Sequence, residues 1–98
     1  MLEIFTTVAN QKQCKQIANA LVKEKLTACV SFWKISSVYK WKGKVHAANE
    51  WMLLVKTSEK LGKKAEAKLR EMHSYEMPVV VVSRVKTDKK VEKWLKQS

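Results

Sequence analysis

The 98 residues of this chain allow one domain, because a chain of this length holds enough apolar surface for a single hydrophobic core. Apolar residues make up 46% and charged residues 30% of the sequence, with two glycines and one proline, which excludes disordered and linker-rich architectures. The 20 Lys and Arg against 9 Asp and Glu give a net charge of +11, which favours acidic partners or a Lys-rich solvated surface.

The first half of the chain predicts a strand, a helix and a long hairpin. Residues 1–8 alternate as a short strand, and residues 11–26 repeat apolar side chains at the spacing of one helical face. Residues 27–41 are rich in β-branched and aromatic side chains. The pair Lys42 and Gly43 supplies a turn before the return arm of residues 44–57.

Both arms of this hairpin exceed the usual strand length of about five to six residues. We therefore expect the hairpin to project beyond the domain or to bend at Ser36 and Ser37. Apolar residues occupy both faces toward the end of the return arm, which indicates a central strand or one covered by another subunit.

The second half of the chain predicts a helix, a strand and a closing helix. Ser58 can cap the first of these helices, with Glu59 in its first turn. The valine run of residues 79–82 is typical of a strand covered on both faces, and Asp88 can cap the closing helix. The order β-α-β-β-α-β-α predicts an α+β, ferredoxin-like fold, in which helices cover one face of an antiparallel sheet.

The two thiols point to a reducing cytoplasm. Cys14 falls in a helical pattern and Cys29 in a strand pattern, and no Cys-x-x-Cys or zinc-finger spacing is present. No window approaches about 18 uncharged apolar residues, so we expect neither a signal peptide nor a membrane span.

Two functional classes that share this topology fit poorly. An RNA-recognition domain would carry a Lys/Arg-Gly-aromatic motif in its third strand, where residues 45–50 do not match. An acylphosphatase-type enzyme would need a glycine-containing phosphate loop with a nearby arginine, and residues 6–10 contain neither. A basic single-stranded nucleic-acid binder remains an alternative, with Trp33, Tyr39 and Trp41 stacking on bases beside the hairpin lysines.

A polar cluster lies between the second helix and the valine strand. His73 can bind a divalent metal or move a proton, Glu76 can join the coordination, and the Tyr75 hydroxyl can complete a polar pocket. The alternative is that His73 caps the helix and interacts with its dipole.

Taken together, these residues resemble the CutA divalent-cation tolerance proteins. The matching segments cover essentially the whole chain in order: Thr6-Thr7, residues 26–30, residues 37–45, Glu50, residues 54–57 and His73-x-Tyr75-Glu76-x-Pro78. The resemblance implies a non-enzymatic, PII-like homotrimer that is linked to divalent metal tolerance. It also implies that sheet edges and long hairpins pack between subunits, with Trp41 and Trp51 at the trimer interface.

The resemblance also implies where ligands bind. Some family members bind copper through a first-strand thiol and adjacent histidines, and this chain has Thr6 and Met72 at two of those positions. A copper site would then rest on His73 and Glu76, without a thiolate. The implied cleft residues are Cys29, Tyr39, Lys56 and Tyr75, which bind a small ligand or complete hydrogen bonds across the interface. No cofactor is required.

Overall fold

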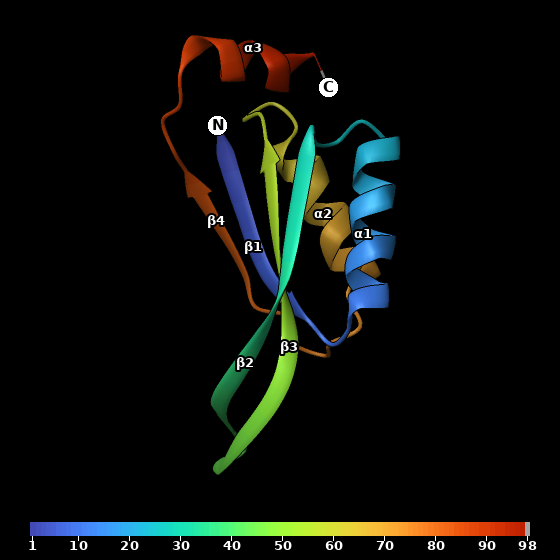
Figure 1. Ribbon diagram of the computed structural model, residues 1–98, viewed down its shortest axis with the longest axis vertical. Coiled ribbons are helices and arrows are strands. Elements are labelled where there is room, and N and C mark those ends of the chain that lie inside the picture. The colour runs from blue at the N-terminus through green and yellow to red at the C-terminus, as the bar shows by residue number, and fades with distance from the viewer. Residues whose placement is uncertain (98) are drawn as a thin grey trace.

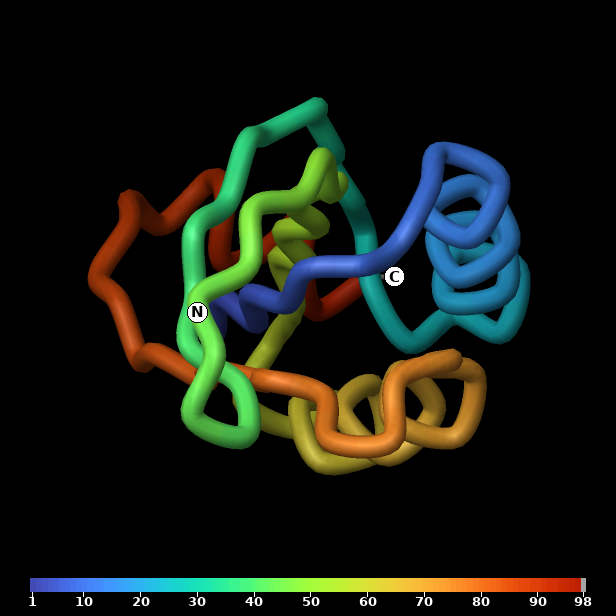
Figure 2. Tube along the Cα trace, turned by 90° about the horizontal axis from the view of Figure 1, so that it is seen from below, coloured from blue at the N-terminus to red at the C-terminus, as the bar shows by residue number. Residues whose placement is uncertain are grey.

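The computed structural model describes residues 1–97 and contains one four-stranded antiparallel sheet and three helices (Figure 1). The elements are β1 (Leu2–Val8), α1 (Gln11–Lys23), β2 (Cys29–Trp41), β3 (Lys44–Thr57), α2 (Gly62–Met72), β4 (Val80–Arg84) and α3 (Lys89–Lys96). The strand order is β2-β3-β1-β4, and α1 and α2 lie on the same side of the sheet (Figure 2). The predicted α+β, ferredoxin-like fold is confirmed.

The core lies between the sheet and these two helices. Its side chains come from β1, β3, α1 and α2, and all of them are fully buried: Ile4, Val8, Cys14, Ile17, Leu21, Leu53, Val55, Ala65 and Leu69. Burying one such aliphatic side chain contributes about 1.5 to 3 kcal/mol, so this layer supplies most of the chain's own stability.

Two helix boundaries differ from the prediction. The first helix was predicted to reach Leu26, but it ends at Lys23 because Lys25 adopts a left-handed backbone conformation with φ of 59°. The second helix starts at Gly62, because residues 58–61 form a turn that precedes it. In this turn the Leu61 N–H donates to the carbonyl and hydroxyl oxygens of Ser58. Ser58 therefore caps that turn.

The hairpin projects from the domain, as one of the two alternatives predicted. Its arms pair without interruption from Cys29 opposite Lys56 to Trp41 opposite Lys44, so no bulge interrupts them at Ser36 and Ser37. The pairing of β3 with β1 stops at Trp51, and the hairpin beyond this point extends away from the sheet (Figure 1). Lys42 and Gly43 both have positive φ, which is typical of a tight two-residue hairpin turn.

The valine strand corrects a prediction. β4 is an edge strand that pairs only with β1, and within this chain its faces are not both covered. Val80 packs against the core, whereas Val81 is 49% and Val82 43% exposed. The run of β-branched residues predicted the strand correctly, but it did not predict which of its faces are covered within the chain.

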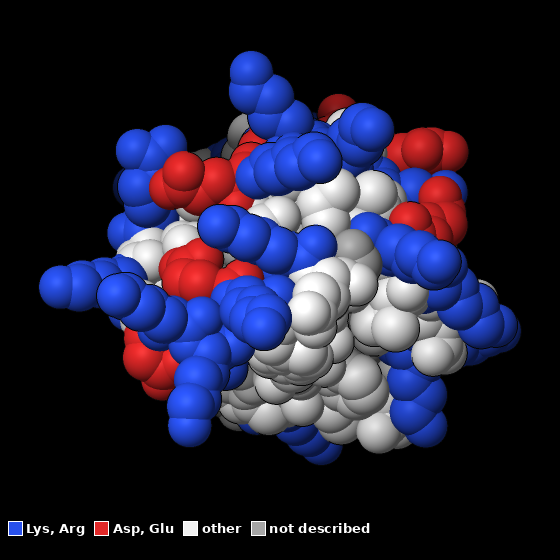
Figure 3. Space-filling view, turned by 90° about the horizontal axis from the view of Figure 1, so that it is seen from above, with Lys and Arg blue, Asp and Glu red and all other residues white. Residues whose placement is uncertain are grey.

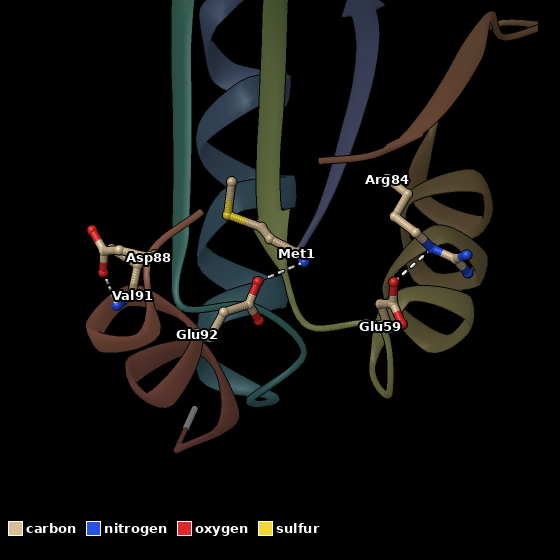
Figure 4. A network of polar contacts seen from close by, with 6 residues as sticks. All are labelled: Met1, Glu59, Arg84, Asp88, Val91 and Glu92. Atoms are coloured by element: carbon tan, nitrogen blue, oxygen red, sulfur yellow. Dashed lines mark hydrogen bonds and ion pairs between the residues drawn. The ribbon is translucent and has the colours of Figure 1, made fainter. Parts of the chain in front are cut away.

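The closing helix is held by polar contacts at the end of the sheet (Figure 4). The Asp88 carboxylate accepts the Val91 N–H at 2.9 Å, which confirms the predicted cap. The Met1 ammonium group donates to Glu92 at 2.8 Å, and this contact fixes α3 against the start of β1.

Cationic side chains are prominent at one end of the molecule. Lys and Arg side chains spread over the end of the molecule that carries α3, with fewer Asp and Glu among them (Figure 3). Among the described residues, no helix has the length and apolar character needed to cross a bilayer.

Candidate functional site

The segment from His73 to Val79 links α2 to β4 and crosses the end of β1. Thr6 is 98% buried, and its hydroxyl donates to the Val79 carbonyl at 2.8 Å. The His73 ring reaches the Thr7 carbonyl at 2.8 Å. These two contacts fasten both ends of the segment to β1, so its side chains have a defined position.

Both ring nitrogens of His73 are used inside the chain. Nε2 donates to the Thr7 carbonyl and lies 3.2 Å from the Thr6 hydroxyl, while Nδ1 accepts the Tyr75 N–H at 3.1 Å. This pattern requires the neutral ring with its proton on Nε2. Burial lowers the pKa of His73 from its usual 6.5, against the opposing effects of the Thr7 carbonyl and the Glu50 charge, and therefore favours the same neutral form.

The Tyr75 side chain joins this segment to the hairpin. The Tyr75 hydroxyl donates to a Glu50 carboxylate oxygen at 2.7 Å, and its ring lies 4.9 Å from the His73 ring. Burial, together with the hydrogen bond and charge of Glu50, raises the pKa of Tyr75, so the phenol stays protonated.

A cleft of about 730 Å³ opens between this segment and the projecting part of the hairpin, mainly its β2 arm. Its lining residues come from β1, β2, β3 and the linking segment: Thr7, Ser37, Val38, Tyr39, Lys40, Trp41, Glu50, Ser74, Tyr75, Glu76, Met77 and Val79. The Tyr39 ring stacks on His46 at 5.5 Å, and the Ser74 hydroxyl donates to Gln13 at 3.0 Å. The cleft therefore combines aromatic walls with two carboxylates.

The structure brings together only some of the predicted site residues. Tyr39, Trp41, Tyr75 and Glu76 line one cleft. Cys29 and Lys56 are cross-strand partners at the other end of the sheet, and ten residues, about 33 Å of strand, separate Cys29 from Tyr39. Within one chain, Cys29 and Lys56 therefore do not line the cleft that contains Tyr39.

The two tryptophans predicted at the trimer interface have different surroundings. Trp51 packs partly buried against the core, with its ring 6.1 Å from that of Phe32, whereas Trp41 lines the cleft and is 38% exposed. The interface role of both residues stays a prediction.

The nucleic-acid alternative also stays a prediction. Six residues, about 20 Å of strand, separate Trp33 from Tyr39.

Glu50 was not among the predicted site residues, although it is one of the residues that match the family. Glu50 is the only acidic residue of β3, and it lies on the same side of that strand as Met52 and Leu54. An acidic side chain that directly precedes apolar residues on the same face was the available signal. Its contact with Tyr75, 25 residues away, depends on how the linking segment crosses β1.

The residues at the copper position that the resemblance implies are already engaged within the chain. The Thr6 hydroxyl is engaged with Val79, and both His73 nitrogens are engaged within the chain. Within residues 1–97, no three His, Cys, Asp or Glu side chains are placed to hold a metal ion together. The metal role of His73 and Glu76 stays a prediction that this geometry disfavours.

Comparisons with known proteins identify the family. The family model described as "CutA1 divalent ion tolerance protein" matches residues 2–98. The divalent-cation tolerance protein CutA of Thermotoga maritima is 30% identical over 99 residues, covering 100% of this chain and 98% of that protein. The chloroplastic CutA protein of Arabidopsis thaliana is 38% identical over 98 residues, covering 97% of this chain. This chain spans about half the length of that plant relative, 53%.

Solved structures agree with this assignment. Pyrococcus horikoshii CutA1 superposes with a TM-score of 0.94 at 26% identity, over 99% of this chain and 96% of that one. A Nostoc protein described as PII-like CutA superposes with a TM-score of 0.90 at 28% identity, over 97% of this chain and 93% of that one. The chain therefore belongs to the CutA1 divalent ion tolerance protein family.

Proposed function

We propose that this chain is a non-enzymatic homotrimer of the divalent ion tolerance family and binds a small ligand in the cleft beside its hairpin. The observation that carries the proposal is the uncovered face of the sheet, which a single chain leaves apolar. The cleft supports the second part, since it concentrates polar and aromatic groups in one concave place.

The open face is the side of the sheet opposite α1 and α2, and it is defined by Phe5, Trp33, Met52, Leu54 and Val81. Cross-strand pairs place these residues next to one another: Phe5 lies opposite both Leu54 and Val81, and Trp33 lies opposite Met52. Trp33 is 43% and Val81 49% exposed. A contiguous apolar face on a chain of this size favours burial against another chain.

The partner that fits this face is a second copy of the chain. The two sheet edges, β2 and β4, are different surfaces with unpaired backbone groups, and joining unlike edges generates a closed ring when the rotation closes. The hairpin projects beyond its own sheet (Figure 1), and such an arm is suited to contact a neighbouring copy. The PII-like description of the Nostoc neighbour supports the same assembly.

The cleft chemistry favours binding over catalysis. Both His73 ring nitrogens are used within the chain, and the Tyr75 phenol stays protonated beside Glu50, so neither side chain is set up to act as a nucleophile or base toward a substrate. The proposed link to divalent ions does not need a copper site at His73. Titration calorimetry with copper(II) and zinc(II) on wild type and His73→Ala tests whether His73 binds a metal ion. Ion binding by the wild type that disappears in the variant would show that His73 is a metal ligand.

The proposed location is the cytoplasm. Cys14 and Cys29 are both free, and Cys14 is fully buried, which suits a reducing compartment. One structural neighbour, from Archaeoglobus fulgidus, is described as periplasmic. Cell fractionation with a compartment marker tests the proposal.

Sedimentation tests the trimer. At micromolar concentration we expect a mass of three times 11.3 kDa. Val81→Lys places a charge on the open face and should dissociate the assembly, whereas Val22→Lys, on an exposed position of α1 that is 47% accessible, should leave it intact. A monomeric wild-type protein would contradict the proposal.

A further inference from the structure

The cleft brings two carboxylates together in a strongly basic molecule. Of its lining residues, Glu50 and Glu76 carry negative charge and Lys40 carries positive charge. The four ion pairs found in residues 1–97 involve other carboxylates, namely those of Glu24, Glu59, Glu66 and Glu92. Although the chain has 20 Lys and Arg, both cleft carboxylates are therefore left without a cationic partner within the described residues.

Three aromatic rings line the same cleft. They belong to Tyr39, Trp41 and Tyr75, and their faces carry the negative end of the ring quadrupole. The Trp41 ring already receives one ammonium group, since Lys42 Nζ lies 5.7 Å from its centroid. This contact shows that a cation can approach that ring, and aromatic faces of this kind also attract ligand cations.

The geometry of Glu50 suits the recognition of a charge. The Tyr75 hydroxyl holds one carboxylate oxygen at 2.7 Å and leaves the other oxygen for a ligand. Because Tyr75 is itself anchored through its N–H to His73, the carboxylate is held before any ligand arrives. A carboxylate held in this way binds a cation without the cost of first ordering its side chain.

We propose that this cleft binds a small organic cation, an amine or quaternary ammonium compound whose alkyl groups contact the aromatic rings and whose charge faces Glu50 and Glu76. The inference rests on the proposed ligand-binding function and names its ligand class. A bare metal ion fits less well, since about 730 Å³ lined partly by Val38, Met77 and Val79 is far larger and more apolar than a coordination site.

Titration calorimetry with matched probes tests the inference. Choline carries the ammonium charge, and 3,3-dimethylbutan-1-ol has the same shape without it. We expect choline to bind about tenfold or more tightly than the neutral probe, because cation–π and carboxylate contacts act only on the charged one. Tetramethylammonium, the charged group alone, should compete with choline.

Three variants localise the binding. Glu50→Gln keeps an oxygen that accepts the Tyr75 hydroxyl but removes the charge, and it should weaken choline binding about tenfold. Glu76→Gln changes an exposed side chain, and it should also weaken choline binding. Glu66→Gln, on α2 and paired with Arg70 outside the cleft, is the control and should leave affinity unchanged.

Three results would overturn the inference: equal affinity for choline and the neutral probe, unchanged affinity in both cleft variants, or no binding of either ammonium probe at millimolar concentration. Sedimentation of the same samples separates this failure from failure of the proposed assembly. A trimer without ammonium preference contradicts only the ligand class, whereas a monomer contradicts the assembly.

Discussion

The hydroxyl of Tyr75 and the carboxylate of Glu50 form a 2.7 Å hydrogen bond that joins two segments 25 residues apart in the sequence. Glu50 lies on β3 where the hairpin leaves the sheet, and Tyr75 lies in the segment between α2 and β4. This contact therefore links two walls of the cleft, since Glu50 and Tyr75 both line it.

Removing this hydroxyl should loosen the cleft wall. We expect Tyr75→Phe to lower the free energy of unfolding by about 1 to 2 kcal/mol, since the lost bond is to a charged group that water can partly solvate. Hydrogen exchange should also become faster in residues 74–77. Tyr39→Phe is the matched control: it removes a phenol from the same cleft that makes no hydrogen bond among those found in residues 1–97, and it should change stability less.

The neutral state of His73 predicts a loss of stability in mild acid. The pKa of the folded protein's His73 lies below the usual 6.5, whereas the unfolded chain keeps a value near the usual one. The unfolded state therefore binds a proton more readily, so the stabilisation is fully present above about pH 6.5 and is lost as the pH falls below it. Denaturant unfolding at about pH 7.5 and about pH 5 measures this difference.

Two variants isolate the contribution of His73. In His73→Gln the amide can still donate to the Thr7 carbonyl but does not titrate, so the loss between the two pH values should shrink. His46→Gln, on the exposed hairpin, should retain the wild-type loss. An identical pH dependence in wild type and His73→Gln would show that other groups cause the effect.

The fold could be predicted because its signals are local. The apolar spacing along α1 and the turn at Lys42 and Gly43 each specify an element without reference to the rest of the chain. The end of α1 could not be predicted, since the left-handed conformation of Lys25 places a non-glycine residue where the sequence gives no signal. The valines of β4 likewise indicate a strand, but they do not reveal whether a helix or another chain covers it.

The candidate site was predictable only in part, because it depends on contacts between distant segments. Tyr39 and Tyr75 line one cleft within this chain, whereas the resemblance implied a cleft between subunits, which stays a prediction. Cys29 lies on the same strand as Tyr39 but at its other end, and sequence proximity to a motif does not convey this separation. The partners of His73 are the Tyr75 N–H and backbone and hydroxyl groups of β1, and these leave no pattern in the sequence.

The buried hydroxyl of Thr57, at the end of β3, should contribute more to the free energy of unfolding than the methyl group of the same side chain. Thr57 is 1% exposed, and its hydroxyl donates to the Leu26 carbonyl at 2.7 Å, while the Thr27 hydroxyl donates to the Lys56 carbonyl. Thr57→Val keeps the shape but removes the donor, so we expect a loss of about 1 to 3 kcal/mol. Thr57→Ser keeps the donor and should lose less in the same unfolding experiment.

The thiol of Cys14 should report global unfolding. Cys14 is fully buried in the core beside Ile17 and Leu21, and burial raises its pKa to about 11, so it is both inaccessible and protonated at neutral pH. In a Cys29→Ser background, which leaves one thiol, we expect iodoacetamide to label Cys14 only as denaturant unfolds the chain. The labelling midpoint should match the midpoint followed by circular dichroism, because a side chain this deep in the core is expected to become exposed only when the whole domain unfolds. Labelling that precedes the circular dichroism transition would instead show that α1 detaches from the sheet while the rest of the fold persists.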